Sequence, residues 1–388
     1  MSTPDAPFSV SFHTSMSDVD AAGWDALARG APLFLRREWL RLLETSGSVG
    51  PRTGWLPLHC AVSRDGRMVG AAPLYAKSHG HAEFVYDQLW ADLARRLERP
   101  YYPKLVAASP FTPAACYRFL TDPDLPSRAL NRLMLRSMDQ LASQNGLSGL
   151  HVLFAQDAFA GELEKLGLHA WEHQSFFWRN EGYADFEDFL RRFGANQRRN
   201  IRRERARLRD QGVRVRVLDA RDCPDAWFAL MYEYYADTND KFGEWGCKFL
   251  TREFFQGLAR SLRDDILFAV AFQGNDRHPM AMAMLVRHND TLYGRYWGCL
   301  EEVPFLHFEL CYYAPIAFAI EQGITLFDPG MGGEHKPRRG FQSATARSLH
   351  RFSDPVLDRL FVSNIRQINR LTHEHVGELN ALCGLRQP

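Results

Sequence analysis

The most informative stretch of the chain is Leu326-Phe-Asp-Pro-Gly-Met-Gly-Gly-Glu-His-Lys-Pro-Arg-Arg-Gly-Phe341. The apolar residues at its start predict a buried strand, and glycines follow at 330, 332 and 333. Glycine lets the backbone turn sharply or lie close to a ligand. Glu334, His335 and Lys336 then place an acid, an imidazole and an amine side by side after the strand. A solvated charged loop is the alternative interpretation, and the rest of the chain favours a functional one.

Length and composition indicate a soluble globular protein with more than one domain. The 388 residues exceed one ordinary domain, and 46% hydrophobic residues are enough for a large core. A net charge of +1 excludes a nucleic-acid binder that is basic overall. Seven scattered cysteines predict reduced thiols in the cytosol, without disulfides or a metal site. Without a secretion signal or a membrane-spanning apolar run, we expect a cytoplasmic protein, at most peripheral at the inner face of the membrane.

The order of predicted elements recurs in the two halves of the chain. A hairpin that turns at Asp65-Gly66 aligns with a second hairpin that turns around Gly274, and helices and strands follow both in the same order. We therefore predict duplication of a mixed α/β domain (α+β with mixed sheets), with a cleft between the halves. The expected domains are 1–165 and 166–355, followed by a C-terminal helix and tail over 356–388.

A helix predicted over 186–211 is unusually rich in arginine. Nine of the nineteen residues from 191 to 209 are arginines, and few acids offset them. Arginine forks suit phosphate, so the partners that fit are coenzyme A phosphates, tRNA backbone or anionic lipid headgroups. The binding candidates are Arg198, Arg199 and Arg202. Because only Phe193 offers base stacking there, tRNA is the less favoured of these partners.

Several longer motifs resemble one known family. They are Ser46-Gly-Ser-Val-Gly-Pro-Arg-Thr-Gly-Trp-Leu-Pro57, Gly70-Ala-Ala-Pro-Leu-Tyr75, Tyr101-Tyr-Pro-Lys104, Pro110-Phe-Thr-Pro113, Tyr293-Gly-Arg-Tyr-Trp-Gly298, His307-Phe-Glu-Leu-Cys-Tyr-Tyr313 and Gly333-Glu-His-Lys336 with Arg339-Gly-Phe341. From about residue 33 to about residue 350, the chain resembles the FemAB-like predicted N-acyltransferases, also called the peptidoglycan biosynthesis/recognition family. The resemblance implies two GNAT-like acyltransferase domains in tandem, which move an acyl group from a thioester or ester onto an amine. It also implies kinship with bacterial ceramide synthases, which acylate a long-chain amino alcohol, and with Fem relatives, which use aminoacyl-tRNA.

Amine acylation needs a base for the amine and an acid for the leaving group. We predict that Glu334 or His335 is the base, with His307 and Glu309 as the second choice. On a helix, positions 307 and 309 lie about 200° apart, so only one of these two side chains faces the site. Tyr296 is the candidate acid for the leaving group.

The matched motifs also imply binding residues. Lys336 and Arg339 would hold the donor's anionic part or the developing charge, next to Gly332 and Gly333. The other binding candidates are Arg295, Trp297, Tyr102, Lys104, Phe111 and Thr112. The resemblance implies acyl-CoA as a co-substrate and a primary amine as acceptor, with no permanently bound cofactor and no metal.

This chain departs from the family pattern at informative positions. Gly332 replaces the glutamine of Gly-Ala-Gln-Gly-Glu-His-Lys, and Ala314 replaces that of Cys-Tyr-Tyr-Gln. Two lost amides predict a less polar pocket, which fits a lipid-like amine better than a peptide. The usual GNAT pyrophosphate loop is absent between Trp297 and His307, so the donor stays open. An aminoacyl-tRNA-dependent transferase and a non-catalytic protein that binds lipid or peptidoglycan precursors are the alternatives.

Overall fold

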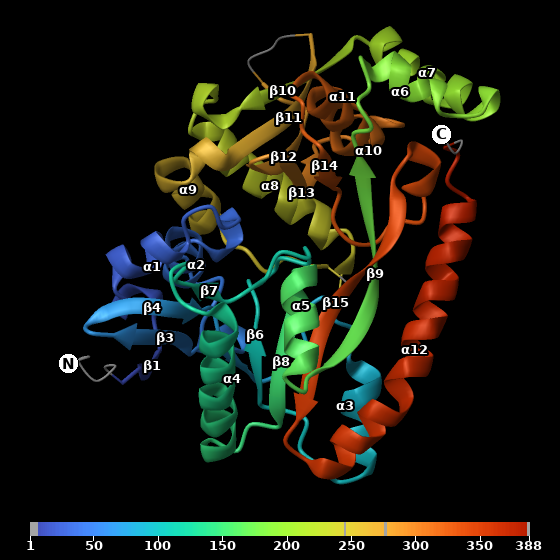
Figure 1. Ribbon diagram of the computed structural model, residues 1–388. Helices are drawn as coiled ribbons and strands as arrows, with labels where there is room; N and C mark the ends of the chain where they lie inside the picture. Colours follow the sequence, from blue (N-terminus) through green and yellow to red (C-terminus); the bar gives the residue numbers. More distant parts are fainter. Residues whose placement is uncertain (1–6, 244–245, 275–277, 386–388) are drawn as a thin grey trace. The chain divides into compact units, whose positions relative to one another are not determined.

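The computed structural model describes residues 7–243, 246–274 and 278–385, which form two compact units (Figure 1). The first unit comprises Met1–His173 with Ala346–Thr372, and the second comprises Gln174–Thr345 with His373–Pro388. Three elements begin in one unit and end in the other: β9 (His169–Arg179), β15 (Gln342–Phe352) and α12 (Pro355–Ala381). The boundaries of these units differ from those of the predicted domains. The domain boundaries and the cleft between the halves stay predictions.

The first unit contains two sheets. One has the antiparallel order β1-β3-β4-β7, and the other has the order β2-β5-β6-β8-β15, in which β6 and β8 pair in parallel. The strands are β1 (Ser9–His13), β2 (Trp55–Pro57), β3 (His59–Arg64), β4 (Arg67–Ala72), β5 (Tyr75–Lys77), β6 (Lys104–Ala107), β7 (Leu120–Thr121) and β8 (Gly149–Ala155). The predicted turn between β3 and β4 is confirmed, because Asp65 and Gly66 have φ of 54° and 74°, as a tight two-residue turn requires.

Helices cover the sheets of the first unit with regularly spaced apolar side chains. They are α1 (Ala21–Leu27), α2 (Arg37–Thr45), α3 (Gln88–Arg96), α4 (Ser127–Gln144) and α5 (Asp157–Lys165). In α4, Leu130, Met134 and Met138 recur every four residues and are buried, which is the apolar stripe of an amphipathic helix. The first turns of α12 contribute Phe361, whose ring lies 4.9 Å from that of Trp90 in α3.

The second unit is built on a sheet with the strand order β10-β11-β12-β13-β14-β9. Its further strands are β10 (Val213–Asp219), β11 (Ile266–Gln273), β12 (Ala281–His288), β13 (Thr291–Cys299) and β14 (Leu326–Asp328). Neighbours are antiparallel except β13 and β14, which run parallel. β13 carries a bulge in which Arg295 is the extra residue.

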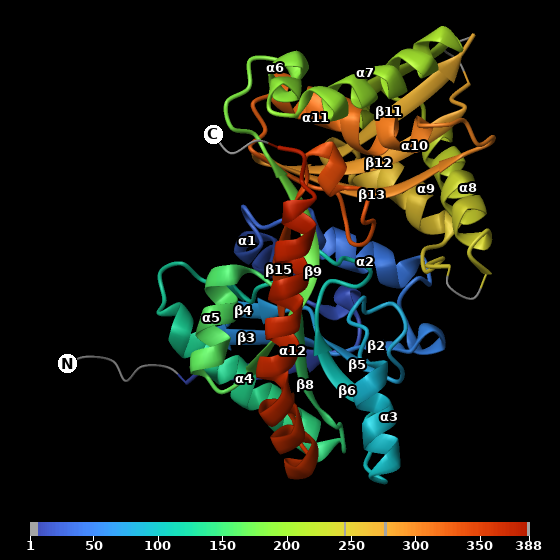
Figure 2. The same ribbon diagram turned by 90° about the vertical axis from the view of Figure 1, so that its right-hand side faces the viewer.

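Helices lie on both faces of this sheet (Figures 1 and 2). On one face are α6 (Phe186–Arg191), α7 (Ala195–Asp210), α10 (Leu306–Phe308), a π-helical turn η7 (Glu309–Tyr313) and α11 (Ala314–Glu321). On the other face are α8 (Ala226–Asp240) and α9 (Arg252–Ser261). Phe228 of α8 packs on Phe268 of β11, with ring centroids 5.0 Å apart. One apolar layer thus lies on each side of the strands.

Apart from β2, β5, α3 and β6 of the first unit, the two units share one chain order, which supports the predicted duplication. A first strand and two helices precede a hairpin, a further strand, a helix and a last strand: β1, α1, α2, β3, β4, β7, α4 and β8 in one unit, and β10, α8, α9, β11, β12, β13, α11 and β14 in the other. The single helix predicted over 186–211 is wrong, because Gly194 takes an extended backbone (φ −60°, ψ 154°) and separates α6 from α7. The predicted turn residues 275–277 lie outside the described residues.

Candidate active site

The segment that follows β14 begins where β13 and β14 stop pairing. β14 pairs with β13 over three residues and ends at Asp328, while β13 continues for six more. Gly330, Gly332 and Gly333 have φ of 81°, 74° and 88°, in the left-handed region that favours glycine. A Cβ at position 333 would lie 2.9 Å from the His335 ring. Gly333 therefore allows the imidazole to fold back against the backbone.

Lys336 fixes this segment from inside. Its buried Nζ donates to the carbonyl oxygens of Gly330 at 2.6 Å and Met331 at 3.4 Å. Burial lowers the pKa of Lys336 to about 8, although Asp328 opposes this shift. Asp328 accepts a hydrogen bond from the Gly330 N–H at 2.7 Å, and burial raises the pKa of its carboxyl group. These contacts stabilise the segment, and a contact of Lys336 with the donor stays a prediction.

Two neutral histidines meet beside this segment. The rings of His307 and His335 lie 5.7 Å apart, and Nε2 of His335 lies 3.0 Å from the Tyr312 hydroxyl. Burial, helped by Arg339 and Lys336, lowers the pKa of His335 to about 4. Burial and the neighbouring His335 lower the pKa of His307 to about 3. Both rings are thus uncharged near pH 7, and an uncharged imidazole can accept a proton.

The side chains of the π-helical turn after His307 point to different partners. Three contacts of 2.8 to 3.1 Å join the buried Glu309 carboxylate to Arg205 of α7. Tyr312 reaches His335, while the Tyr313 hydroxyl donates to another acid of α7. In this arrangement His307 lies beside His335, and Glu309 is occupied by an arginine instead of being placed as a base.

The two aromatic candidates on β13 lie on opposite faces of the sheet. Trp297 packs on His307, with ring centroids 4.5 Å apart. Tyr296 packs on Tyr235 of α8 at 5.1 Å, and burial raises its pKa to about 12. The structure therefore brings Trp297, and not Tyr296, to the histidines. Arg295, the bulge residue just before Tyr296, has its guanidinium near the ring of Tyr293, at 5.4 Å.

Arg339 is buried and contacts both the segment and α7. Its Nη1 donates to the His335 carbonyl at 3.0 Å, and Nη2 lies 3.3 Å from a carboxylate oxygen of Glu204. The guanidinium carbon lies 3.3 Å from the ring centroid of Phe308, a cation–π geometry. Arg339, like Lys336, therefore has hydrogen-bond partners within the chain. Its contact with a donor stays a prediction.

The arginine-rich helix α7 has two different faces. The inward face repeats at helical spacing and consists of Gln197, Ile201, Glu204, Arg205 and Leu208. Of the predicted binding arginines, Arg198 is half-buried, whereas Arg199 and Arg202 are exposed. Arg202 pairs with Glu187 at 2.6 Å, and Arg199 donates to the amide oxygen of Asn196. The outward face is therefore the one that can meet an anionic partner.

Four predicted binding residues belong to the first unit: Tyr102, Lys104, Phe111 and Thr112. The last three of these are buried. Lys104 forms ion pairs with Glu83, at 2.7 Å, and with Asp87. The Tyr102 hydroxyl donates to Asp87 at 3.2 Å. The structure thus gives Lys104 carboxylate partners within the first unit.

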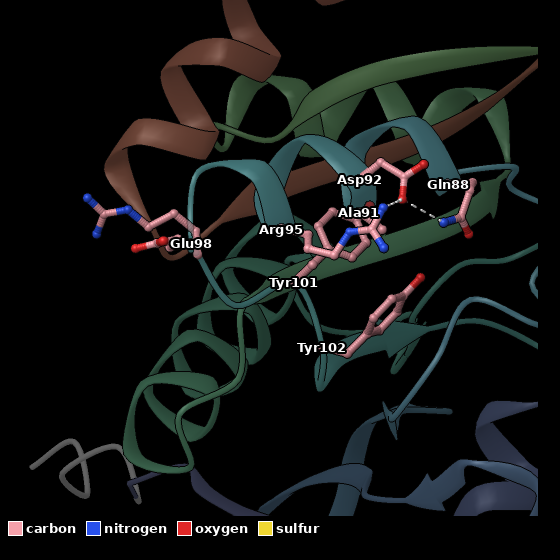
Figure 3. A pocket seen from close by; sticks show the side chains of 8 residues that line it. Gln88, Ala91, Asp92, Arg95, Glu98, Tyr101 and Tyr102 are labelled. Carbon is pink, nitrogen blue, oxygen red and sulfur yellow. Dashed lines mark hydrogen bonds and ion pairs between the residues drawn. The ribbon is translucent and has the colours of Figure 1, made fainter.

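One surface pocket of the first unit lies along α3 and has a volume of about 580 Å³ (Figure 3). It is lined by Gln88, Ala91, Asp92, Arg95, Glu98, Arg99, Tyr101 and Tyr102. Gln88 and Arg95 both donate to Asp92, at 3.1 and 2.9 Å. The lining holds two acids and two arginines, so the pocket offers little net charge to a ligand. Among the predicted site residues, it includes Tyr102.

Sequence reasoning missed the residues that hold the histidines in place. Tyr312 stands within one of the matched motifs without a predicted role, and Glu204 and Arg205 lie within the arginine-rich stretch. Helical periodicity could have pointed to this face of the helix, because Gln197 and Glu204 recur at helical spacing with the apolar residues 201 and 208. A polar residue in the apolar stripe of a helix needs a buried partner.

Three further features of the chain concern metal-binding groups, disulfides and membrane-spanning helices. Among the described residues, no three or more His, Cys, Asp or Glu side chains are grouped so as to hold a metal ion. All seven cysteines are free thiols. Within the described ranges, every helix is too short or too polar to cross a bilayer.

Comparison with known proteins places these features in a family. The model of the FemAB-like family, described as peptidoglycan biosynthesis/recognition, matches residues 15–387. No curated protein matches the chain. The crystal structure of FemX superimposes with a TM-score of 0.51 at 14% identity, over 88% of this chain and 98% of that one. The C-terminal domain of a putative lysylphosphatidylglycerol synthetase from Agrobacterium fabrum gives 0.50 at 10% identity, over 90% and 97%. A tandem GNAT protein from the clavulanic acid biosynthesis pathway gives 0.45 at 12% identity, over 90% and 99%.

The fold is shared with FemX, and the family model names the FemAB-like group. Since the family model covers nearly the whole chain, the chain belongs to the FemAB-like family. This confirms the family resemblance inferred from the motifs, and the superposition on FemX confirms the mixed α/β fold class.

Proposed function

We propose that the chain transfers an acyl group from an acyl-CoA-type thioester to a primary amine, with His335 as the base. The observation that carries the proposal is the neutral His335 ring, which contacts Tyr312 and lies next to His307. In the reaction, the amine nitrogen attacks the thioester carbonyl, a C–N bond forms and the C–S bond breaks. His335 takes the proton that the amine loses and passes it to the departing thiolate, which leaves as the thiol.

An anionic donor would make His335 a better base. The two cations near the ring, Arg339 and Lys336, contribute to its low pKa. Negative charge brought by the phosphates of a bound donor would offset these cations and raise the pKa of His335 toward its ordinary value. The ring would then accept a proton more readily when the donor is present, which is when the reaction needs it.

The surroundings of the histidines favour an apolar acceptor. Trp297, Phe308 and Tyr312 contribute aromatic rings around His307. Gly332 and Ala314 offer no hydrogen-bonding side chain near these rings. A long-chain amino alcohol meets both features, with an amine for the reaction and a hydrocarbon chain for apolar contacts.

Thiol release provides the test. Acyl-CoAs of short to long chain are each offered sphinganine, a lysine peptide or no amine, with wild-type protein and His335→Ala. Amine-dependent release that His335→Ala loses supports the proposal. Mutation of the exposed His375 to Ala is the matched control and should leave release unchanged. Release with the lysine peptide and not with sphinganine would show that the acceptor is a peptide amine. Release by His335→Ala at the wild-type rate would reject His335 as the base.

A second candidate function is aminoacyl transfer from charged tRNA. It is favoured by the outward face of α7, where Arg199 and Arg203 contact only the amide groups of Asn196 and Asn200 among the bonds described. A polyanion could exchange these neutral partners for phosphates. Charged tRNA replaces acyl-CoA as donor in the same assay. Transfer that weakens steeply with salt would favour this function over the thioester-dependent one.

A further inference from the structure

The inward face of α7 holds both segments that carry the paired histidines. Arg205 binds the carboxylate of Glu309, two residues after His307. The adjacent residue, Glu204, binds Arg339, four residues after His335. Two neighbouring side chains of one helix thus fix two segments that are distant in sequence.

Glu204 sits at the centre of a short chain of hydrogen bonds. Its carboxylate accepts from the Tyr313 hydroxyl at 2.6 Å and from Arg339 Nη2 at 3.3 and 3.4 Å. Arg339 in turn donates through Nη1 to the backbone carbonyl of His335 at 3.0 Å. The side chains of Glu204 and Arg339 are only 13% and 8% exposed, so water competes little for these bonds.

We propose that Glu204 is a positioning residue, which holds the His335 ring against Tyr312 through Arg339 and Tyr313. The inference rests on the proposed function of His335. Tyr313 and Tyr312 are adjacent in the π-helical turn, so anchoring one hydroxyl on Glu204 also fixes the direction of the other. Without the carboxylate, Tyr313 loses its acceptor and Arg339 keeps only the His335 carbonyl, so both ends of the His335 contact are held less firmly.

The outer face of α7 offers a matched control. Glu187 also pairs with an arginine of this helix, Arg202, at 2.6 Å, but both side chains are more than half exposed. Exposed ion pairs contribute little to structure. Glu187→Ala should therefore leave the histidines unchanged, while Glu204→Ala should disturb them.

The experiment compares Glu204→Ala, Glu204→Gln and Glu187→Ala. Steady-state kinetics give kcat and the KM for the amine, and NMR of nitrogen-15-labelled histidine rings follows the titration of His335. We expect Glu204→Ala to lower kcat by at least about tenfold, with little change in KM, because the base is misplaced. The His335 pKa should rise toward its ordinary value as Arg339 moves away. Glu204→Gln keeps an acceptor oxygen and should recover much of both properties.

Wild-type kcat and an unchanged His335 titration in Glu204→Ala would overturn the proposal. If this variant does not fold, Arg339→Lys replaces it, since one ammonium cannot reach both Glu204 and the His335 carbonyl. Unchanged kcat and titration there would overturn the proposal equally. A shifted His335 titration in a protein that transfers no acyl group would reject the proposed function, while the positioning of His335 by Glu204 would stand.

Discussion

Replacing Arg205 by methionine should destabilise the second unit, because it leaves Glu309 buried without its partner. The two side chains are 24% and 8% exposed. Breaking a buried ion pair by removing one partner costs about 3–5 kcal/mol, and the partial exposure of Arg205 reduces this to about 2–3 kcal/mol. For a unit of this size, the melting temperature should fall by roughly 4–12 °C.

The reverse replacement should cost less. In Glu309→Met the charge left behind is Arg205, which is partly exposed and can turn toward water. The double variant, with methionine at both positions, removes both charges and should be close to Glu309→Met in stability. Thermal unfolding followed by circular dichroism measures all four proteins, and the cycle gives the coupling between the two residues.

The same proteins decide whether Glu309 is a base. If its carboxylate only fixes the π-helical turn beside His307, the folded double variant should keep turnover within about tenfold of wild type. If Glu309 were the catalytic base, the double variant would lose turnover even though its stability is restored. Melting of Arg205→Met at the wild-type temperature would refute the energetic reasoning, and an inactive but stable double variant would refute the structural role of Glu309.

Three other predictions concern acid sensitivity, the glycine-rich segment and the outer face of α7. His335 has a pKa of about 4 in the folded protein and an ordinary value near 6.5 in the unfolded chain, so between these pH values it binds fewer protons when folded. The free energy of unfolding should therefore fall as the pH drops through this window. His335→Gln should lessen this loss, which is measured as the difference between the urea midpoints at pH 7 and pH 5. Lys336→Met should cost about 1–3 kcal/mol in thermal unfolding, because the Gly330 carbonyl loses its buried donor; an unchanged melting curve would contradict this. Joint replacement of Arg199, Arg202 and Arg203 by glutamine should change stability by less than about 0.5 kcal/mol and weaken sedimentation with anionic vesicles; equal sedimentation of both proteins would argue against membrane contact.

The fold could be predicted from the sequence where patterns are local. The Asp65-Gly66 turn and the strongly periodic helices are confirmed, and the recurrence of elements was enough to predict the duplication. The strands β9 and β15 were not predicted, because buried and partly buried side chains do not alternate regularly along either of them. The break at Gly194 was not predicted, because its extended backbone is available to any residue and a single glycine is no strong stop signal.

The candidate site could be predicted only in part. The motifs identified His335 and His307, which the structure brings together, from segments that follow two neighbouring strands. The side chains that orient them could not be found, because Glu204 and Arg339 are 135 residues apart and Arg205 and Glu309 are 104 apart. No local pattern encodes such pairs, and only the three-dimensional fold shows that one helix carries both.

The most direct test of the central claim is thiol release from a long-chain acyl-CoA, with and without sphinganine, by wild-type protein and His335→Ala. The account predicts release that requires the amine and that falls at least about a hundredfold in His335→Ala, while the protein stays folded. Equal release by the two proteins, or release that does not depend on any amine, would contradict it.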